Sequence, residues 1–207
     1  MHKGAFKGKN LATNPTILIL GESHYQSNGY DPEFTTEGVV LDYFQDPNCQ
    51  RYKFFDKIVT CFGFAPEERE KFWNQVWFGN YVTSSDCGVG TTRARELVAK
   101  NRGQYNRELF DFVNTHGIDT IFCFSRMVYN NMPGRASFES EGVRIATEKL
   151  HGKADYISQF IYLPGERPYG DVALKKPLTV YGFRHPSARG GFAVSHYFPF
   201  IREHCQL

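Results

Sequence analysis

The chain has 207 residues, of which 41% are hydrophobic and 22% are charged, and its formal net charge is +2. This length suits one domain with a single sizeable core, and this composition excludes a disordered or fibrous chain. The small net charge excludes a protein that holds nucleic acid with one large basic surface, so any such contact would need a local patch. No stretch of the sequence is long and apolar enough to suggest a membrane span, so no membrane partner is expected.

Five cysteines are spread along the chain, and no two of them form a Cys-x-x-Cys pair. A zinc or iron–sulfur site is therefore not expected, and the sequence predicts neither a metal nor a cofactor. An odd number of cysteines without a secretory signal indicates reduced thiols and predicts a cytoplasmic protein. These cysteines are Cys49, Cys61, Cys87, Cys123 and Cys205.

The first fifteen residues are predicted to form an arm in front of the domain. Residues 16–20 are all aliphatic or β-branched and are followed by Gly21, a pattern typical of a strand buried on both faces. A polar, titratable run, residues 22–24, follows at once. Residues 26–36 form a loop that is longer than a plain connection needs, and such loops in compact domains commonly bind ligands.

Helical spacing of hydrophobic residues extends over residues 36–62. A further helix is predicted from Pro66 to about Gln75, because proline and acidic residues favour the first turn of a helix. Residues 76–82 predict a second buried strand, and the polar residues 83–92 form the loop after it.

The second half of the chain continues to alternate strands with helices, except at residues 135–155, which carry no clear pattern. The strands are predicted at residues 118–124, 156–163 and 178–183, and the helices at residues 93–115, 125–131 and 192–205. This alternation predicts an α/β fold with three layers, α/β/α, around a central, mostly parallel sheet of four or five strands. Since no linker, repeat or low-complexity run interrupts the chain, residues 1–207 are predicted to form one domain.

Polar side chains lie at the ends of three predicted strands. Residues Glu22–Tyr25 follow the first strand, Asn80 lies near the end of the second, and His185–Ser187 follow the last. Ligands of open α/β sheets bind in the crevice at the carboxyl ends of the strands. We therefore expect these three segments to meet in one cleft.

The three segments, taken in this order, resemble the motifs of the uracil-DNA glycosylase superfamily. Gly21–Tyr25 is similar to the motif after the first strand, Trp77–Val82 to the strand whose asparagine reads the base, and His185–Ser187 to the motif before the final helix. Ile118–Tyr129 resembles the third strand of that family and the helix after it. The chain departs from the family pattern at His24, where a proline is usual.

The resemblance implies a monofunctional DNA glycosylase of base-excision repair, acting as a monomer on single- or double-stranded DNA. Glu22 would stabilise the positive charge that develops on the sugar and would orient water. His185 would donate a hydrogen bond to the departing base. Ser23 is the third catalytic candidate, because it stands where the best-known branch of the family has the aspartate that positions water.

The resemblance also suggests how an extruded base would be recognised. Asn80 offers both a donor and an acceptor to the edge of a flipped pyrimidine. Tyr25 stands where the family has a tyrosine that blocks substituents at C5 of the base, and Phe34 is a candidate for stacking. His24, beside Tyr25, belongs to the same predicted base-binding group.

Contacts to the DNA backbone are expected from hydroxyl groups, cations and free backbone N–H groups at the start of a helix. The candidates are Ser84, Ser85, Arg93, Ser187 and Arg189.

Two other interpretations stay open on the sequence alone. The first is a serine esterase with Ser23 as nucleophile and His185 as base, although Gly182 stands where such enzymes have the aspartate that orients the histidine. The second is a module on the same fold that binds a nucleotide or a modified base without cleaving it.

Overall fold

The structure is a computed structural model of the chain. It describes residues 4–23, 35–45, 52–83, 93–133, 144–150, 155–168, 172–188, 192–205 and 207.

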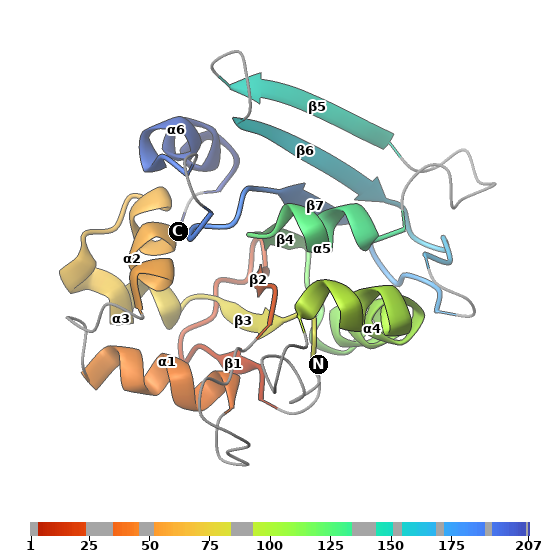
Figure 1. The fold of residues 1–207 in the computed structure, drawn as a ribbon, viewed down its shortest axis with the longest axis horizontal. Helices are drawn as coiled ribbons and strands as arrows, with labels where there is room; N and C mark the ends of the chain where they lie inside the picture. The colour runs from red at the N-terminus through yellow and green to blue at the C-terminus, as the bar shows by residue number, and fades with distance from the viewer. Residues whose placement is uncertain are drawn as a thin grey trace.

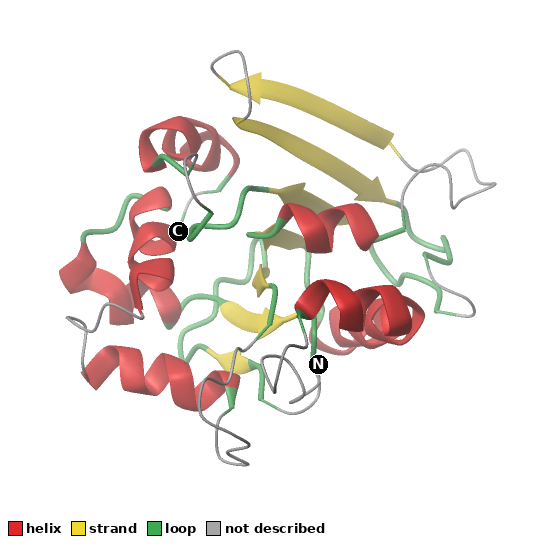
Figure 2. Cartoon of the chain, viewed as in Figure 1, coloured by secondary structure: helices red, strands yellow, loops and turns green. Residues whose placement is uncertain are grey.

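One mixed β-sheet runs through the described part of the molecule, with helices on both of its faces (Figures 1 and 2). Its four central strands are parallel, and the outer strands on both sides are antiparallel to their neighbours. In spatial order the seven strands are β1 (Phe6–Lys7), β3 (Trp77–Asn80), β2 (Ile17–Gly21), β4 (Thr120–Cys123), β7 (Leu178–Gly182), β6 (Asp155–Tyr162) and β5 (Arg144–Leu150).

The α/β class is confirmed, and the sheet corrects the prediction in three places. The N-terminal arm contributes a strand, because Phe6 pairs with Phe78 at the edge of the sheet. The strand predicted at residues 156–163 is present as β6, but it runs antiparallel to β7 and forms a hairpin with β5. The region without a clear pattern therefore contains β5, and the sheet is wider and less parallel than expected.

The helices divide between the two faces of the sheet. Leu18 and Leu20 of β2 face one core, which α4 and α5 cover, whereas Ile17 and Ile19 face a second core under the other four helices. This division gives three layers, α/β/α, as predicted. The helices are α1 (Thr36–Gln45), α2 (Lys53–Cys61), α3 (Arg69–Trp73), α4 (Ala94–His116), α5 (Arg126–Asn131) and α6 (Val194–His204).

Helix boundaries follow local capping. Gly117 ends α4 in the left-handed conformation, with φ of 62°, which glycine adopts without steric cost. The helix expected at residues 93–115 is present as α4, with a kink at Asn101, whose φ is −122°. The helical region predicted at residues 36–62 contains α1 and α2, with residues 46–51 between them outside the described part.

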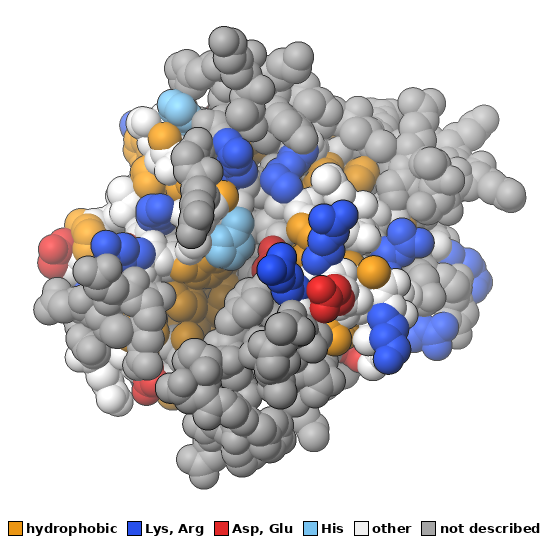
Figure 3. All heavy atoms as spheres, in the orientation of Figure 1, with side chains coloured by type: hydrophobic (Ala, Val, Ile, Leu, Met, Phe, Trp, Pro, Cys, Tyr) orange, Lys and Arg blue, Asp and Glu red, His pale blue; other side chains and the backbone are white. Residues whose placement is uncertain are grey.

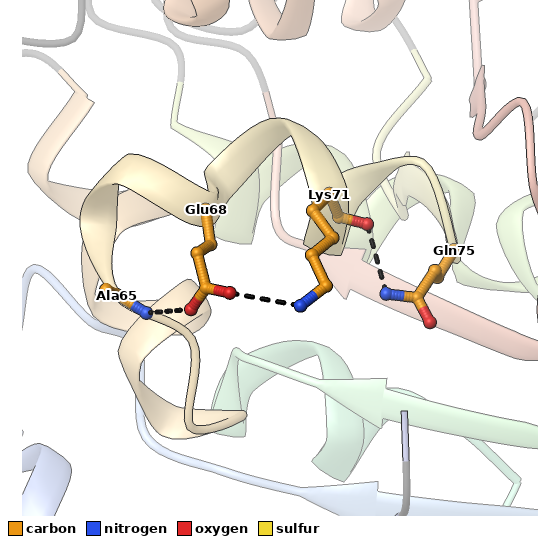
Figure 4. Close-up of polar contacts among 4 residues, drawn as sticks. All are labelled: Ala65, Glu68, Lys71 and Gln75. Carbon is orange, nitrogen blue, oxygen red and sulfur yellow. Dashed lines mark hydrogen bonds and ion pairs between the residues drawn. The ribbon is translucent and has the colours of Figure 1, made fainter.

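The predicted helix start at Pro66 is confirmed as a short 3-10 turn, η2 (Pro66–Glu68), that leads into α3. Glu68 accepts a hydrogen bond from the backbone N–H of Ala65 at 3.1 Å and pairs with Lys71 at 3.0 Å (Figure 4). These two contacts hold the pKa of the Glu68 carboxyl below its ordinary value. At the carboxyl end of α3, the side-chain amide of Gln75 donates a hydrogen bond to the Lys71 carbonyl.

None of the helices in the described ranges is both long and apolar enough to cross a membrane.

Candidate functional site

The order of the parallel strands creates a crevice at one edge of the sheet. From β2 the chain moves to β3 on one side, and then crosses back to β4 on the other side. Such a reversal leaves an opening between the carboxyl ends of the two strands that flank it, and α/β proteins bind their ligands there. The carboxyl ends of β2 and β4 are thus the place where this fold favours a site.

Glu22 lies directly at this reversal. Its backbone carbonyl accepts a hydrogen bond from Val82 N–H at 3.0 Å, which continues the pairing of β2 with β3. Its side chain turns toward the other neighbour, where Oε2 accepts a hydrogen bond from the Ser125 hydroxyl at 2.8 Å. Glu22 is therefore tied to both neighbouring strand ends, by its backbone carbonyl on the β3 side and by its carboxylate on the β4 side.

Asn80 ends β3 beside Gly21, with which it is in register. A Cβ atom built on Gly21 would lie 2.5 Å from Asn80 Oδ1, so the amide occupies the space where a side chain at position 21 would be. Asn80 is buried, with 9% of its surface exposed. Gly21 thus allows a polar amide to sit next to Glu22.

His185 enters the same edge from the end of β7. Its Nδ1 accepts a hydrogen bond from the backbone N–H of Ser187 at 3.1 Å. Since Nδ1 accepts, the neutral ring carries its proton on Nε2. The imidazole is thus held as a donor through Nε2, and its ring packs against Phe54 of α2 with centroids 5.1 Å apart.

Burial lowers the pKa of His185, and the nearby Lys57 cation lowers it further, while the Glu22 carboxylate acts in the opposite direction. The net shift is downward, so the ring is neutral at pH 7. The influence of Glu22 on His185 also shows that these two groups, 163 positions apart in the sequence (185 − 22), lie close enough to interact. The structure brings the predicted acid and the predicted imidazole together.

Three residues near this edge were not predicted from the sequence. Phe54 is partly exposed and packs on His185, and Lys57, one helical turn later, donates to the Pro186 carbonyl at 2.6 Å. Ser125 is 1% exposed and holds Glu22. The sequence alone indicates that Phe54 and Lys57, three positions apart, share one face of a helix. Only the fold shows what that face contacts.

The remaining candidates are placed as follows. Ser23 is partly exposed, directly after Glu22, while Ser187 and Arg93 are exposed, after β7 and before α4. The other six lie outside the described residues: His24, Tyr25, Phe34, Ser84, Ser85 and Arg189.

The face that carries this edge is hollowed (Figure 3). Hydrophobic side chains form the floor of the hollow on the side of α2, a histidine lies at its rim, and Lys and Arg side chains gather toward α4 and α5. A separate depression, at the amino end of β3, contains none of the candidate residues. It is lined by Glu70 and Lys71 of α3, by Asn74 and Gln75 just after this helix, and by Asn10.

The described residues contain no group of three or more His, Cys, Asp and Glu side chains that could hold a metal ion. Cys61, Cys123 and Cys205 are free and buried. Burial raises the pKa of each of these thiols to about 12, so they are protonated and unreactive at pH 7.

A scan of the chain against protein-family models gives no match, and a search of curated proteins gives none either.

Proposed function

We propose that this protein is a DNA glycosylase that takes uracil or another modified pyrimidine out of the DNA stack and hydrolyses its N-glycosidic bond. Water would add to the anomeric carbon while the bond to the base breaks, and the base would leave with the bonding electrons and then take up a proton. The product is an abasic site. The observation that carries this proposal is the meeting of Glu22, Asn80 and His185 at one edge of the sheet.

Glu22 has the properties that the sugar side of this reaction requires. As the bond breaks, positive charge builds on the sugar, and a fixed carboxylate stabilises that charge and can orient the attacking water. The hydrogen bond from Ser125 fixes the direction of this carboxylate.

His185 has the properties that the base side requires. The departing pyrimidine becomes negatively charged, and a donor held in advance stabilises that charge without reorganisation. The backbone N–H of Ser187 occupies Nδ1, which leaves Nε2–H as the donor. A lowered pKa keeps the ring neutral, so its single N–H proton is the one on Nε2 and is the donor to the departing base.

A site for an extruded base also needs groups that hydrogen-bond its edge and a ring that stacks on it. Asn80 and Phe54 are the candidates for these two roles. The Asn80 amide carries both a donor and an acceptor for the hydrogen-bonding edge of the base. Phe54 presents a partly exposed ring beside His185, and it joins Tyr25 and Phe34 as a candidate for stacking.

The chain is proposed to act on single- or double-stranded DNA as a monomer, without cofactor, with Ser187 and Arg93 near the backbone together with the predicted Ser84, Ser85 and Arg189. Buried free thiols at Cys61, Cys123 and Cys205 support a reducing, cytoplasmic setting. DNA repair is the proposed role.

The geometry counts against the serine esterase. In a Ser-His-Asp triad the Nδ1–H group of the histidine donates to the carboxylate, which leaves Nε2 free to accept the proton of the serine. In His185 the opposite arrangement holds, because Nδ1 is the acceptor.

The test is to incubate the protein with oligonucleotides that carry uracil or a series of 5-substituted pyrimidines, in single- and double-stranded form, and to cleave abasic sites with alkali. We expect strand cleavage at one or more of these bases. Binding without cleavage across the whole series would favour a module that holds the base without excising it.

A further inference from the structure

Ser125 lies between the last residue of β4 and the first turn of α5, and its side chain has two partners. Its hydroxyl oxygen accepts a hydrogen bond from Val128 N–H at 3.2 Å, which makes it the N-cap of α5. The same oxygen lies 2.8 Å from Glu22 Oε2. With 1% of its surface exposed, Ser125 is too deeply buried to touch a substrate.

The direction of the second hydrogen bond follows from proton counting. A backbone N–H can only donate, so the Val128 contact uses a lone pair of the serine oxygen. The single hydroxyl proton is then available for Glu22, and it stabilises the carboxylate as an acceptor. A hydrogen bond to a charged group is shorter and stronger than one between neutral groups, and it selects one orientation of the carboxylate.

We infer that Ser125 is a positioning residue, which acts on the reaction only through Glu22. This inference rests on the proposed function, because it assumes that Glu22 serves the chemistry. The contact joins residues 103 positions apart and crosses the reversal point between β2 and β4. Ser125 thereby couples the cap of α5 to the direction of the acid, and a loss of this contact would misdirect the carboxylate without changing the surface that binds DNA.

The difficulty for a test is that Ser125 also caps a helix. Glycine is tolerated at the N-cap with a loss of only a few tenths of a kcal/mol, whereas alanine is not. Ser125→Gly therefore removes the hydrogen bond to Glu22 while it largely preserves the helix. Asn131→Ala is the matched control, because Asn131 closes the other end of α5 by donating to the Met127 carbonyl and has no contact with Glu22 among the described interactions.

The experiment is a double-mutant cycle on the single-turnover rate of base release, with DNA affinity measured in parallel. We expect Ser125→Gly to lower the rate on the order of 10- to 100-fold with unchanged affinity. In the Glu22→Gln background the same substitution should change the residual rate less than about twofold, since the carboxylate is already gone. Asn131→Ala should leave the rate within about twofold of wild type.

Two results would overturn the role of Ser125 while leaving the proposed function intact. One is a Ser125→Gly rate equal to that of wild type, and the other is the same fold-loss of rate in the wild-type and Glu22→Gln backgrounds. A wild-type protein that releases no base from any oligonucleotide would overturn the proposed function, and the role of Ser125 with it.

Discussion

The Lys57 ammonium group donates a hydrogen bond to the Pro186 carbonyl at 2.6 Å, and so α2 holds the loop that carries His185. The same cation lies near the imidazole and contributes to lowering its pKa. One side chain therefore both fixes the position of the histidine and favours its neutral form.

Removal of this cation should make protonation of His185 easier. Lys57→Met is expected to raise the pKa of His185 above its wild-type value, because burial remains but the repulsion by the ammonium is lost. The neutral fraction of the ring at mildly acidic pH should then fall, and the acidic limb of the rate profile should move to higher pH. The measurement is an NMR titration of the His185 ring. Lys57→Arg, which keeps the charge, is the control, and identical titration curves for Lys57→Met and wild type would contradict the account.

Phe54 should contribute to base binding more than to folding. Stacking of an aromatic ring on an extruded base is worth about 1–3 kcal/mol, which corresponds to roughly a 5- to 150-fold change in affinity. Phe54→Leu is expected to weaken binding to DNA that carries the target base by such a factor, while binding to abasic DNA changes little.

Phe62→Leu provides the comparison for Phe54→Leu. Phe62 is a half-buried aromatic residue just after α2, and its ring packs on Phe72 and Phe122, away from His185. The Phe62→Leu substitution should lower the free energy of unfolding without a selective loss of affinity for DNA that carries the target base. Equal effects of both substitutions on target and abasic DNA would show that Phe54 is an ordinary core residue.

Two glycines at the strand ends should respond differently to the same substitution. Gly21→Ala places a methyl group against the Asn80 amide, whose terminal atoms can move aside, so stability should change little while base release slows. A displacement near 1 Å can cost on the order of 100-fold in rate. Gly182→Ala instead drives its methyl group into the ring of Tyr129, which is stacked on Phe160 with centroids 4.4 Å apart and cannot yield.

We expect Gly182→Ala to lower the free energy of unfolding by about 1–3 kcal/mol, as overpacking of a dense core does. Urea denaturation and base-release assays on both variants give the comparison. A Gly21→Ala protein with full activity would argue that the position of the Asn80 amide is unimportant.

The central strands were predictable because their residues are mainly apolar, and in β2 the run is unbroken up to Gly21. Ile17, Leu18, Ile19 and Leu20 are all fully buried, as the continuous run of residues 16–20 predicted. The outer strands carry weaker signals. β1 has only two residues, too few for a period, and β6 alternates, with Ser158, Phe160 and Tyr162 buried while Gln159 and Ile161 are partly exposed. That alternation lies in burial and not in residue type, because the buried Ser158 is polar and the more exposed Ile161 is apolar, so the sequence does not reveal the direction of β6.

The candidate site was predictable only in part, for a physical reason. Glu22, Asn80 and His185 follow strands whose ends share one edge, so strand prediction alone placed them near one another. Ser125 and Lys57 depend on contacts between segments 103 and 129 positions apart. No local pattern in the sequence distinguishes a capping serine that also holds a carboxylate from one that only caps a helix.

The account depends most directly on the carboxylate of Glu22. The decisive measurement is the single-turnover release of free base from a uracil-containing oligonucleotide, followed by mass spectrometry, for wild type and Glu22→Gln. We expect wild type to release the base and Glu22→Gln to do so at least about 100-fold more slowly, with unchanged affinity for the DNA. Release of the base at the same rate by both proteins, or no release by wild type, would contradict the proposed role of the Glu22 carboxylate.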